Sequence, residues 1–127
     1  MKNSALFISL AMTCFAAHAE WKSYAKNTEV EEFFDTAYIS KESGIIKLWT
    51  LSNYVSPITT LEGKEILSEK SLTTLDCSSQ KIGAEKIIKY EKKSAQGNVV
   101  SEMETALRLS SIRSGSADQI LKEKLCR

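Results

Sequence analysis

The sequence contains little of several residue types, and each shortage excludes a class of protein. With one proline and five glycines in 127 residues, the chain is neither collagen-like nor of low complexity. Its 17 basic side chains are balanced by 16 acidic ones, so it lacks the concentrated positive charge that nucleic-acid binding requires. Outside the N-terminal segment, no apolar run approaches the roughly 20 residues of a transmembrane helix. The composition, 43% apolar and 26% charged residues, is typical of one globular domain.

The N-terminal 19 residues have the pattern of a secretory signal peptide. Lys2 supplies a positive charge, residues 5–17 form an uncharged and mostly apolar run, and alanines at 17 and 19 mark a cleavage site. We therefore expect residues 1–19 to be removed by cleavage between Ala19 and Glu20. The alternative is a buried N-terminal helix, which would not require this order of charge, apolar run and small residues.

The chain that remains, residues 20–127, is neutral and contains no histidine. Its 108 residues include 16 basic and 16 acidic side chains. The lack of histidine excludes imidazole acid–base catalysis and imidazole metal ligands. Cys14 lies inside the signal segment, and a lipidated cysteine there is an alternative. Thr13 before it is a poor match to the small residue of lipoprotein signals, so we expect Cys14 to leave with the signal.

Two cysteines, Cys77 and Cys126, remain after cleavage. In the oxidising compartment that export implies, an even pair is typical of a disulfide. The bridge would close a loop of 50 residues, counting both cysteines, and the chain-entropy model gives about 4 kcal/mol for such a loop. A reactive or metal-binding pair is the alternative, although neither cysteine belongs to a C-x-x-C motif.

The hydrophobic period along most of the mature chain is two, which indicates strands. The segments with this character are residues 21–25, 33–39, 45–54, 68–79, 81–93 and 99–109. A turn cluster at 40–44 predicts a hairpin between the second and third of them. Pro57 is expected to end the third strand, because proline cannot donate to a ladder, and residues 56–67 to form a long mobile loop. Residues 99–109 alternate most regularly and predict a half-buried strand.

Beyond Gly115 the period becomes that of a helix. Ser116 and Gln119 match a capping box, in which the serine hydroxyl accepts from the Gln119 N–H and the Gln119 side chain returns to the Ser116 N–H. The apolar residues that share one helical face are Ala117, Ile120, Leu121 and Leu125. Cys126 lies off that face, so either the helix frays there or the bridge leaves from its edge. The predicted fold is α+β, an antiparallel sheet of five or six strands with a short C-terminal helix packed on one face, stapled by the bridge to the strand that carries Cys77.

Several short features follow one another along the mature chain. They are Trp21, Phe33-Phe34-Asp35, a Ser/Lys/Gly turn, Trp49, Leu51, Tyr54, Ser68, Lys70, Asp76-Cys77, Tyr90, Gly97, Gly115-Ser116 and Cys126. This order resembles the surface-adhesin protein E family of Gram-negative bacteria over nearly the whole mature chain. The sequence departs from the family pattern at two places, since Ala106-Leu107 stands where a tryptophan is usual and Ser114 where a proline is usual.

The resemblance implies an exported, non-enzymatic binding domain, in the periplasm or on the cell surface of a Gram-negative bacterium. It implies a protein partner, a host extracellular or envelope protein engaged through the sheet face. The alternative is a periplasmic envelope protein that inhibits or stabilises a soluble partner. Association of two copies through an open sheet edge is a further expectation.

The residues themselves offer no catalytic constellation. No nucleophile–base pair is present, and Glu102 and Glu104 lie two apart on one strand face, where glutamates are usually solvated rather than paired across a substrate. The sequence contains no glycine-rich phosphate loop, zinc spacing or calcium loop. We therefore expect no enzyme activity, no cofactor and no metal.

Two groups of residues are candidate contact sites. One is a basic strip with a net charge of +3 within residues 81–93, and its members are Lys81, Lys86, Lys89, Lys92 and Lys93. It would meet an acidic or sulfated partner, or the −3 segment at 20–43 of a second copy; the alternative is a solvated strand whose lysines prevent edge pairing. The other is an aromatic face made of Trp21, Trp49, Tyr54 and Tyr90, for which core and sheet-edge packing is the alternative.

Overall fold

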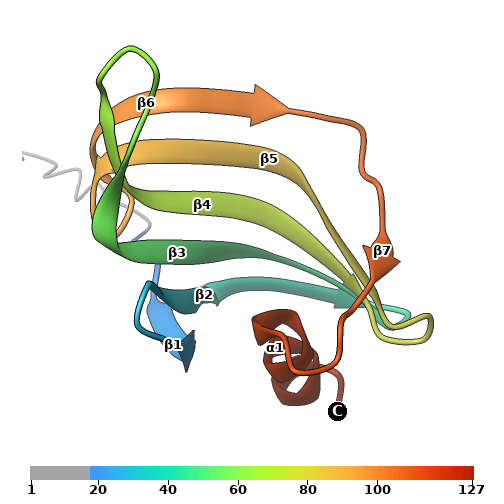
Figure 1. Ribbon diagram of the computed structural model, residues 1–127. Coiled ribbons are helices and arrows are strands. Elements are labelled where there is room, and N and C mark those ends of the chain that lie inside the picture. Colours follow the sequence, from blue (N-terminus) through green and yellow to red (C-terminus); the bar gives the residue numbers. More distant parts are fainter. Residues whose placement is uncertain (1–17) are drawn as a thin grey trace, which may run out of the picture.

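Strands dominate the structure, a computed structural model that describes residues 18–127 (Figure 1). The elements are β1 Trp21–Lys26, β2 Val30–Glu42, β3 Ile45–Thr59, β4 Glu65–Asp76, β5 Lys81–Lys92, β6 Gln96–Glu104, β7 Ser110–Ser111 and α1 Ala117–Leu125. Strands β1 to β6 neighbour one another in chain order, every pair is antiparallel, and β7 pairs with β5. The predicted α+β fold is confirmed. The expected signal segment falls almost entirely on residues 1–17, which lie outside the described residues.

The β2–β3 hairpin forms where the turn cluster predicted it. Glu42 pairs with Ile45, and the two residues between them, Ser43 and Gly44, have φ angles of 50° and 77°. Two successive left-handed residues are typical of a type I′ turn, whose twist matches that of the strands it joins. Glycine adopts this conformation without a steric penalty, so the sequence at 43–44 sets the register of the part of the hairpin next to the turn, up to the shift between Phe34 and Ile39.

Strand β3 is longer than predicted and contains Pro57. The expectation that Pro57 ends the strand and that residues 56–67 form a long loop is wrong, because only residues 60–64 connect β3 to β4. Regular pairing with β4 is interrupted between Asn53 and Ile58. The proline lies in that interruption, where its missing N–H is not needed by the ladder. The end of this hairpin, green in Figure 1, extends beyond β6.

Strand β6 differs from its prediction in length and burial. It ends at Glu104 rather than continuing to residue 109, and eight of its nine residues are exposed, including Val99 and Met103 at 51% each. Its alternating apolar residues are uncovered because, among the described residues, β6 is an edge strand that pairs with β5 alone. The chain then leaves the sheet and crosses β5 at Gly83, where a Cβ would lie 2.2 Å from the Arg108 carbonyl oxygen.

Helix α1 begins one residue after the predicted cap. The Ser116 hydroxyl accepts a hydrogen bond from the Gln119 N–H at 3.3 Å, as predicted. The other half of the capping box is different, because the Gln119 side chain accepts from the N–H of Gly115 rather than of Ser116. Asp118 lies in the first turn and two lysines in later turns, which suits the helix dipole.

The core lies between α1 and one end of the sheet. Leu121 is fully buried and packs on Phe34, Ile46, Leu48 and Leu75. Burial of a side chain of this size contributes about 1.5–3 kcal/mol, so this cluster is what holds a helix too short to be stable alone. The predicted apolar face of the helix is only partly buried, since Ile120 remains 38% exposed.

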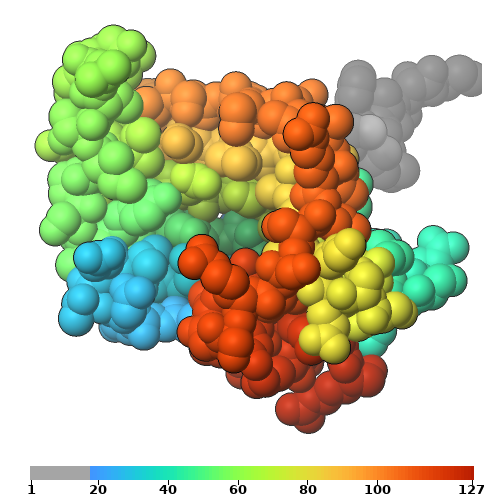
Figure 2. Space-filling view, turned by 45° about the vertical axis from the view of Figure 1, so that its right-hand side comes forward, coloured from blue at the N-terminus to red at the C-terminus, as the bar shows by residue number. Residues whose placement is uncertain are grey.

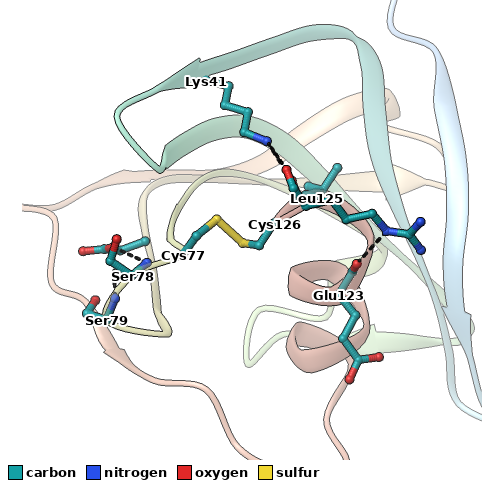
Figure 3. The surroundings of a disulfide bond; sticks show 9 residues. Lys41, Cys77, Ser78, Ser79, Glu123, Leu125 and Cys126 are labelled. Carbon is teal, nitrogen blue, oxygen red and sulfur yellow. Dashed lines mark hydrogen bonds between the residues drawn. A yellow bond between two sulfur atoms is a disulfide. The ribbon is translucent and has the colours of Figure 1, made fainter.

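The disulfide between Cys77 and Cys126 is present, and it fastens the C-terminal end of α1 to the residue that follows β4 (Figure 3). Cys126 is the C-cap and has left the helical conformation, so the helix ends before the bridge instead of offering it from an edge. Nearby, the Lys41 ammonium donates to the carbonyls of Leu125 and Arg127 at 3.3 and 3.2 Å. A covalent bond and two hydrogen bonds therefore fix the same end of the helix.

Helix α1 covers only part of the concave face of the sheet. Its nine residues span about 14 Å, whereas the 15 residues of β3 span about 50 Å. Residues two apart on a strand share a face, and the series on this side of β3 changes from buried Ile46 and Leu48 to half-buried Thr50 and Ser52. The concave face thus becomes polar beside the N-terminal end of the helix, where α1 no longer covers it.

Candidate functional site

A polar cavity of about 360 Å³ opens on the concave face beside the first turn of α1. Figure 2 shows the hollow, bordered by β1 (blue), α1 (red) and the segment that precedes α1 (orange). Its floor carries four hydroxyl residues of the central strands, Thr50, Ser52, Ser71 and Thr73. The register explains this grouping, because Thr50 pairs with Ser71 and its hydroxyl lies 2.9 Å from that of Thr73.

Two carboxylates on the concave face are held in place by hydroxyl donors. The Ser52 hydroxyl donates to Glu32 Oε2 at 2.6 Å, and the Tyr54 hydroxyl donates to Glu69 Oε2 at 3.1 Å. Glu32 lines the cavity itself, and Glu69 lies two residues before Ser71, on the same face of β4. Each of these bonds orients a carboxylate while engaging only one of its two oxygens.

The acidic groups at the cavity are destabilised in their charged form. Burial raises the pKa of Glu32, and the charges of Asp118 and Glu69 raise it further, while the hydrogen bond from Ser52 lowers it. Burial likewise raises the pKa of Asp118. Burial, and then the charges of Glu32 and Asp118, raise the pKa of Tyr24 at the rim. None of the ion pairs found within residues 18–127 includes Glu32 or Asp118.

Replacing Glu32 by glutamine is expected to raise Tm at neutral pH by a few degrees. The pKa of the Glu32 carboxyl is higher in the folded than in the unfolded protein. The free energy of unfolding therefore falls as pH rises from the unfolded to the folded pKa, and above the folded pKa the full penalty is present. Glutamine removes that penalty and keeps an acceptor for Ser52. The gain in Tm over wild type should therefore shrink as pH falls towards the ordinary value of 4.5. Asp118, Glu69, Tyr24 and Tyr54 face the same region and are unchanged in this comparison.

Thermal unfolding of wild type and Glu32→Gln across this pH range tests the prediction. Glu31→Gln is the matched control, because Glu31 is the next residue on β2 and also accepts from a serine, Ser23, but at the surface. It should leave Tm unchanged or slightly lower. A Glu32→Gln variant that is less stable than wild type at neutral pH would show that the carboxylate stabilises the fold.

The structure does not bring the five predicted basic residues onto one face. Lys86 and Lys89 lie in a stretch of β5 that pairs regularly with β4 and β6, so their side chains point to opposite faces. On the convex face, Lys86 forms ion pairs with Glu102 and Glu104 at 3.0 and 3.2 Å. The remaining three, Lys81, Lys92 and Lys93, are exposed at the ends of β5.

The four predicted aromatic residues are also divided. Trp49 lies on the convex face, and the Lys70 ammonium is 4.7 Å from its ring centre. Tyr54 lies on the concave face, where it donates to Glu69. Trp21 belongs to the edge strand β1, and Tyr90 pairs with Ser68 near the far end of β5. All four are half-buried.

A family model described as surface-adhesin protein E matches residues 21–127 of the sequence. The chain belongs to the surface-adhesin protein E family. Two solved structures of Haemophilus influenzae protein E are similar to it. One, of crystal form II, has a TM-score of 0.70 at 12% identity and covers 87% of this chain and 90% of that chain. The other has a TM-score of 0.67 at 14% identity and covers 87% and 86%. A comparison with curated proteins gives no match.

At these identities the likeness to Haemophilus influenzae protein E shows a shared fold, while membership rests on the family match. Membership in the surface-adhesin protein E family makes this a surface-adhesin-like domain of an exported protein. Within residues 18–127, no helix is both long and apolar enough to cross a membrane. No three acidic, cysteine or histidine side chains converge there in a way that would hold a metal ion.

The cavity residues of this surface-adhesin protein E domain were not among the residues predicted from sequence. Glu32, Thr50, Ser71 and Asp118 come from four elements and have no common motif. A weak signal was present in the third predicted strand, where the inward series changes from Ile46 and Leu48 to threonine and serine. That change marks the part of a buried-looking strand that is not covered.

Proposed function

We propose that residues 20–127 form the mature, exported domain of a non-enzymatic adhesin that engages a host extracellular or envelope protein through its sheet face. Membership in the surface-adhesin protein E family supports the adhesin role. The observation that carries the choice of surface is the concave face, which α1 leaves open and polar over the cavity. A sheet face that served only to pack the helix would not need hydroxyls and half-buried carboxylates beyond it.

Display on the surface of a Gram-negative bacterium is the second part of the proposal. The signal pattern at residues 1–19, with cleavage between Ala19 and Glu20, supports export. The alternative function, a periplasmic protein that inhibits or stabilises a soluble envelope partner, uses the same signal and disulfide. Location separates the two, because an adhesin must be reachable from outside the cell.

Protease treatment of intact cells tests this proposal. For a surface adhesin, the domain is degraded on intact cells, and the cells retain it when the periplasm is released by osmotic shock. Protection on intact cells together with release in the periplasmic fraction would contradict surface display and favour the periplasmic alternative. Mass spectrometry of the purified protein checks cleavage after Ala19 in the same preparation.

Association of two copies is proposed through the edge of β6. No strand of the described part of the chain pairs with its outer edge, and eight of its nine residues are exposed. An unpaired edge is a template for pairing with another strand. The exposed lysines at the ends of β5, Lys81, Lys92 and Lys93, are proposed as peripheral contacts for an acidic partner. Sedimentation of the wild-type domain and of the Glu102→Pro variant tests the edge contact, because the Glu102 N–H points away from β5 towards the open edge.

A further inference from the structure

The polar cavity on the concave face combines three features that an unoccupied sheet surface does not need. It is hollowed to about 360 Å³, it is lined by residues from β1 to β5, β7 and α1, and its carboxylate Glu32 is fixed by the Ser52 hydroxyl at 2.6 Å. A carboxylate that is oriented in advance binds a donor with little further loss of side-chain entropy. The geometry therefore provides acceptors that point into a space large enough for a side chain.

The charge of this cavity is uncompensated. Glu32 and Asp118 line it, and none of its lining residues is a lysine or arginine. Lys89 pairs with Glu69 in the β4–β5 ladder and therefore lies on the same face of the sheet, but it does not line the cavity. Within residues 18–127, three acids form ion pairs, Glu85, Glu102 and Glu104. Glu32 and Asp118 are half-buried at the cavity without an ion pair in this range.

We propose that the cavity receives a basic side chain, arginine or lysine, of the protein that this domain binds, an inference that rests on the proposed adhesin function. Glu32 and Asp118 would accept hydrogen bonds from the guanidinium or ammonium group. The Tyr24 ring and the floor hydroxyls of Thr50 and Ser71 would line the aliphatic stem and the remaining donors. The occupant is thus an exposed basic segment of a protein.

The raised pKa values at this site support the same occupant. Burial keeps Glu32 and Asp118 in an environment that disfavours their charge, and the domain retains both carboxylates at a cost in stability. Perturbed acids gathered in a hollow are a feature of binding sites. A bound cation would stabilise the charged form of both carboxylates and so remove this penalty.

Titration of the oxidised domain with a blocked oligo-arginine peptide, at low and at physiological ionic strength, tests the inference. The variant is the pair Glu32→Gln and Asp118→Asn. The matched control is Glu102→Gln with Glu104→Gln, which changes the net charge equally on the convex side. We expect saturable binding by wild type and by the control, and affinity weakened about tenfold or more in the cavity variant. In NMR spectra recorded during the titration, the backbone amide chemical shifts of Tyr24 and Thr50 should change.

Several outcomes would overturn the inference. Equal loss in both variants would mean that only net charge attracts the peptide. Saturation by calcium ions alone, or by a neutral oligosaccharide, at the same residues would assign the cavity to a metal or a sugar. The cavity variant should unfold at a Tm at or above that of wild type, so loss of binding cannot be attributed to loss of the fold.

The same variants separate this inference from the proposed function. If cells displaying the cavity variant bind host matrix as wild type does, the cavity assignment fails and the adhesin proposal stands. If the peptide binds the cavity but cells displaying the wild-type domain bind no host protein, the adhesin proposal fails and the cation site stands.

Discussion

Replacing Cys77 and Cys126 together by alanine is expected to lower the free energy of unfolding by about 4 kcal/mol. The bridge joins residues 49 positions apart, so its removal restores the freedom of a long loop to the unfolded chain. It also releases the C-terminal end of α1, which then depends on the core and on the two hydrogen bonds from Lys41. For a domain whose total stability is about 5–15 kcal/mol, this is a large share.

Denaturant unfolding with and without reductant measures this effect. Wild type should be weakened by reductant to the level of the double variant, and the double variant should be indifferent to reductant. A double variant within about 1 kcal/mol of oxidised wild type would mean that loop closure contributes little here. Helix content followed by circular dichroism shows whether α1 detaches before the sheet unfolds.

Leu121→Ala is expected to destabilise the domain by about 2–5 kcal/mol. Leu121 is fully buried against Phe34, Ile46, Leu48 and Leu75, and the shortened side chain would leave a cavity in the contact that holds α1 to the sheet. The adjacent Ile120→Ala is the matched control. Ile120 is 38% exposed, and its removal should have a much smaller effect on the free energy of unfolding.

Chemical denaturation of the two alanine variants in the oxidised protein provides the comparison. If both variants lose the same stability, α1 is held by its general hydrophobicity and not by the insertion of Leu121 into the core. Retention of the disulfide in both should be checked by thiol titration, since the bridge alone would keep a loosened helix near the sheet.

Local signals were enough to predict several parts of the fold. The turn within residues 40–44, the helix start at Ser116 and the pairing of Cys77 with Cys126 each depend on a few neighbouring residues or on the number of cysteines. The structure confirms all three. A left-handed backbone, helix capping and an even number of cysteines are local or countable features, so they could be recognised without the tertiary arrangement.

Features that depend on neighbouring strands could not be predicted in this way. Pro57 lies inside β3 because the β4 ladder is interrupted there, and β6 is exposed because no strand of residues 18–127 lies beyond it. A proline does end a regularly paired strand, and alternating apolar residues are half-buried in a strand that the rest of the protein covers. The sequence contains no local mark of an interruption or of a sheet edge.

The candidate site depends on register and on the length of α1. The lysines of β5 were grouped by their proximity in sequence, although Lys86 and Lys89 are three positions apart and therefore face opposite sides of the sheet. Predicting the cavity would have required the strand register around Thr50 and the position at which α1 begins. Only the assembled sheet brings Glu32 and Asp118 to one hollow, so the site emerges from tertiary structure.

We propose that the concave sheet face of this adhesin-like domain binds its protein partner, and surface plasmon resonance of the oxidised 20–127 domain over immobilised host extracellular matrix tests this. We expect saturable binding that is lost when Glu32→Gln and Asp118→Asn are combined and retained when Glu102→Gln and Glu104→Gln are combined. Equal binding by the two variants, or no binding by wild type, would show that the concave face is not the binding surface.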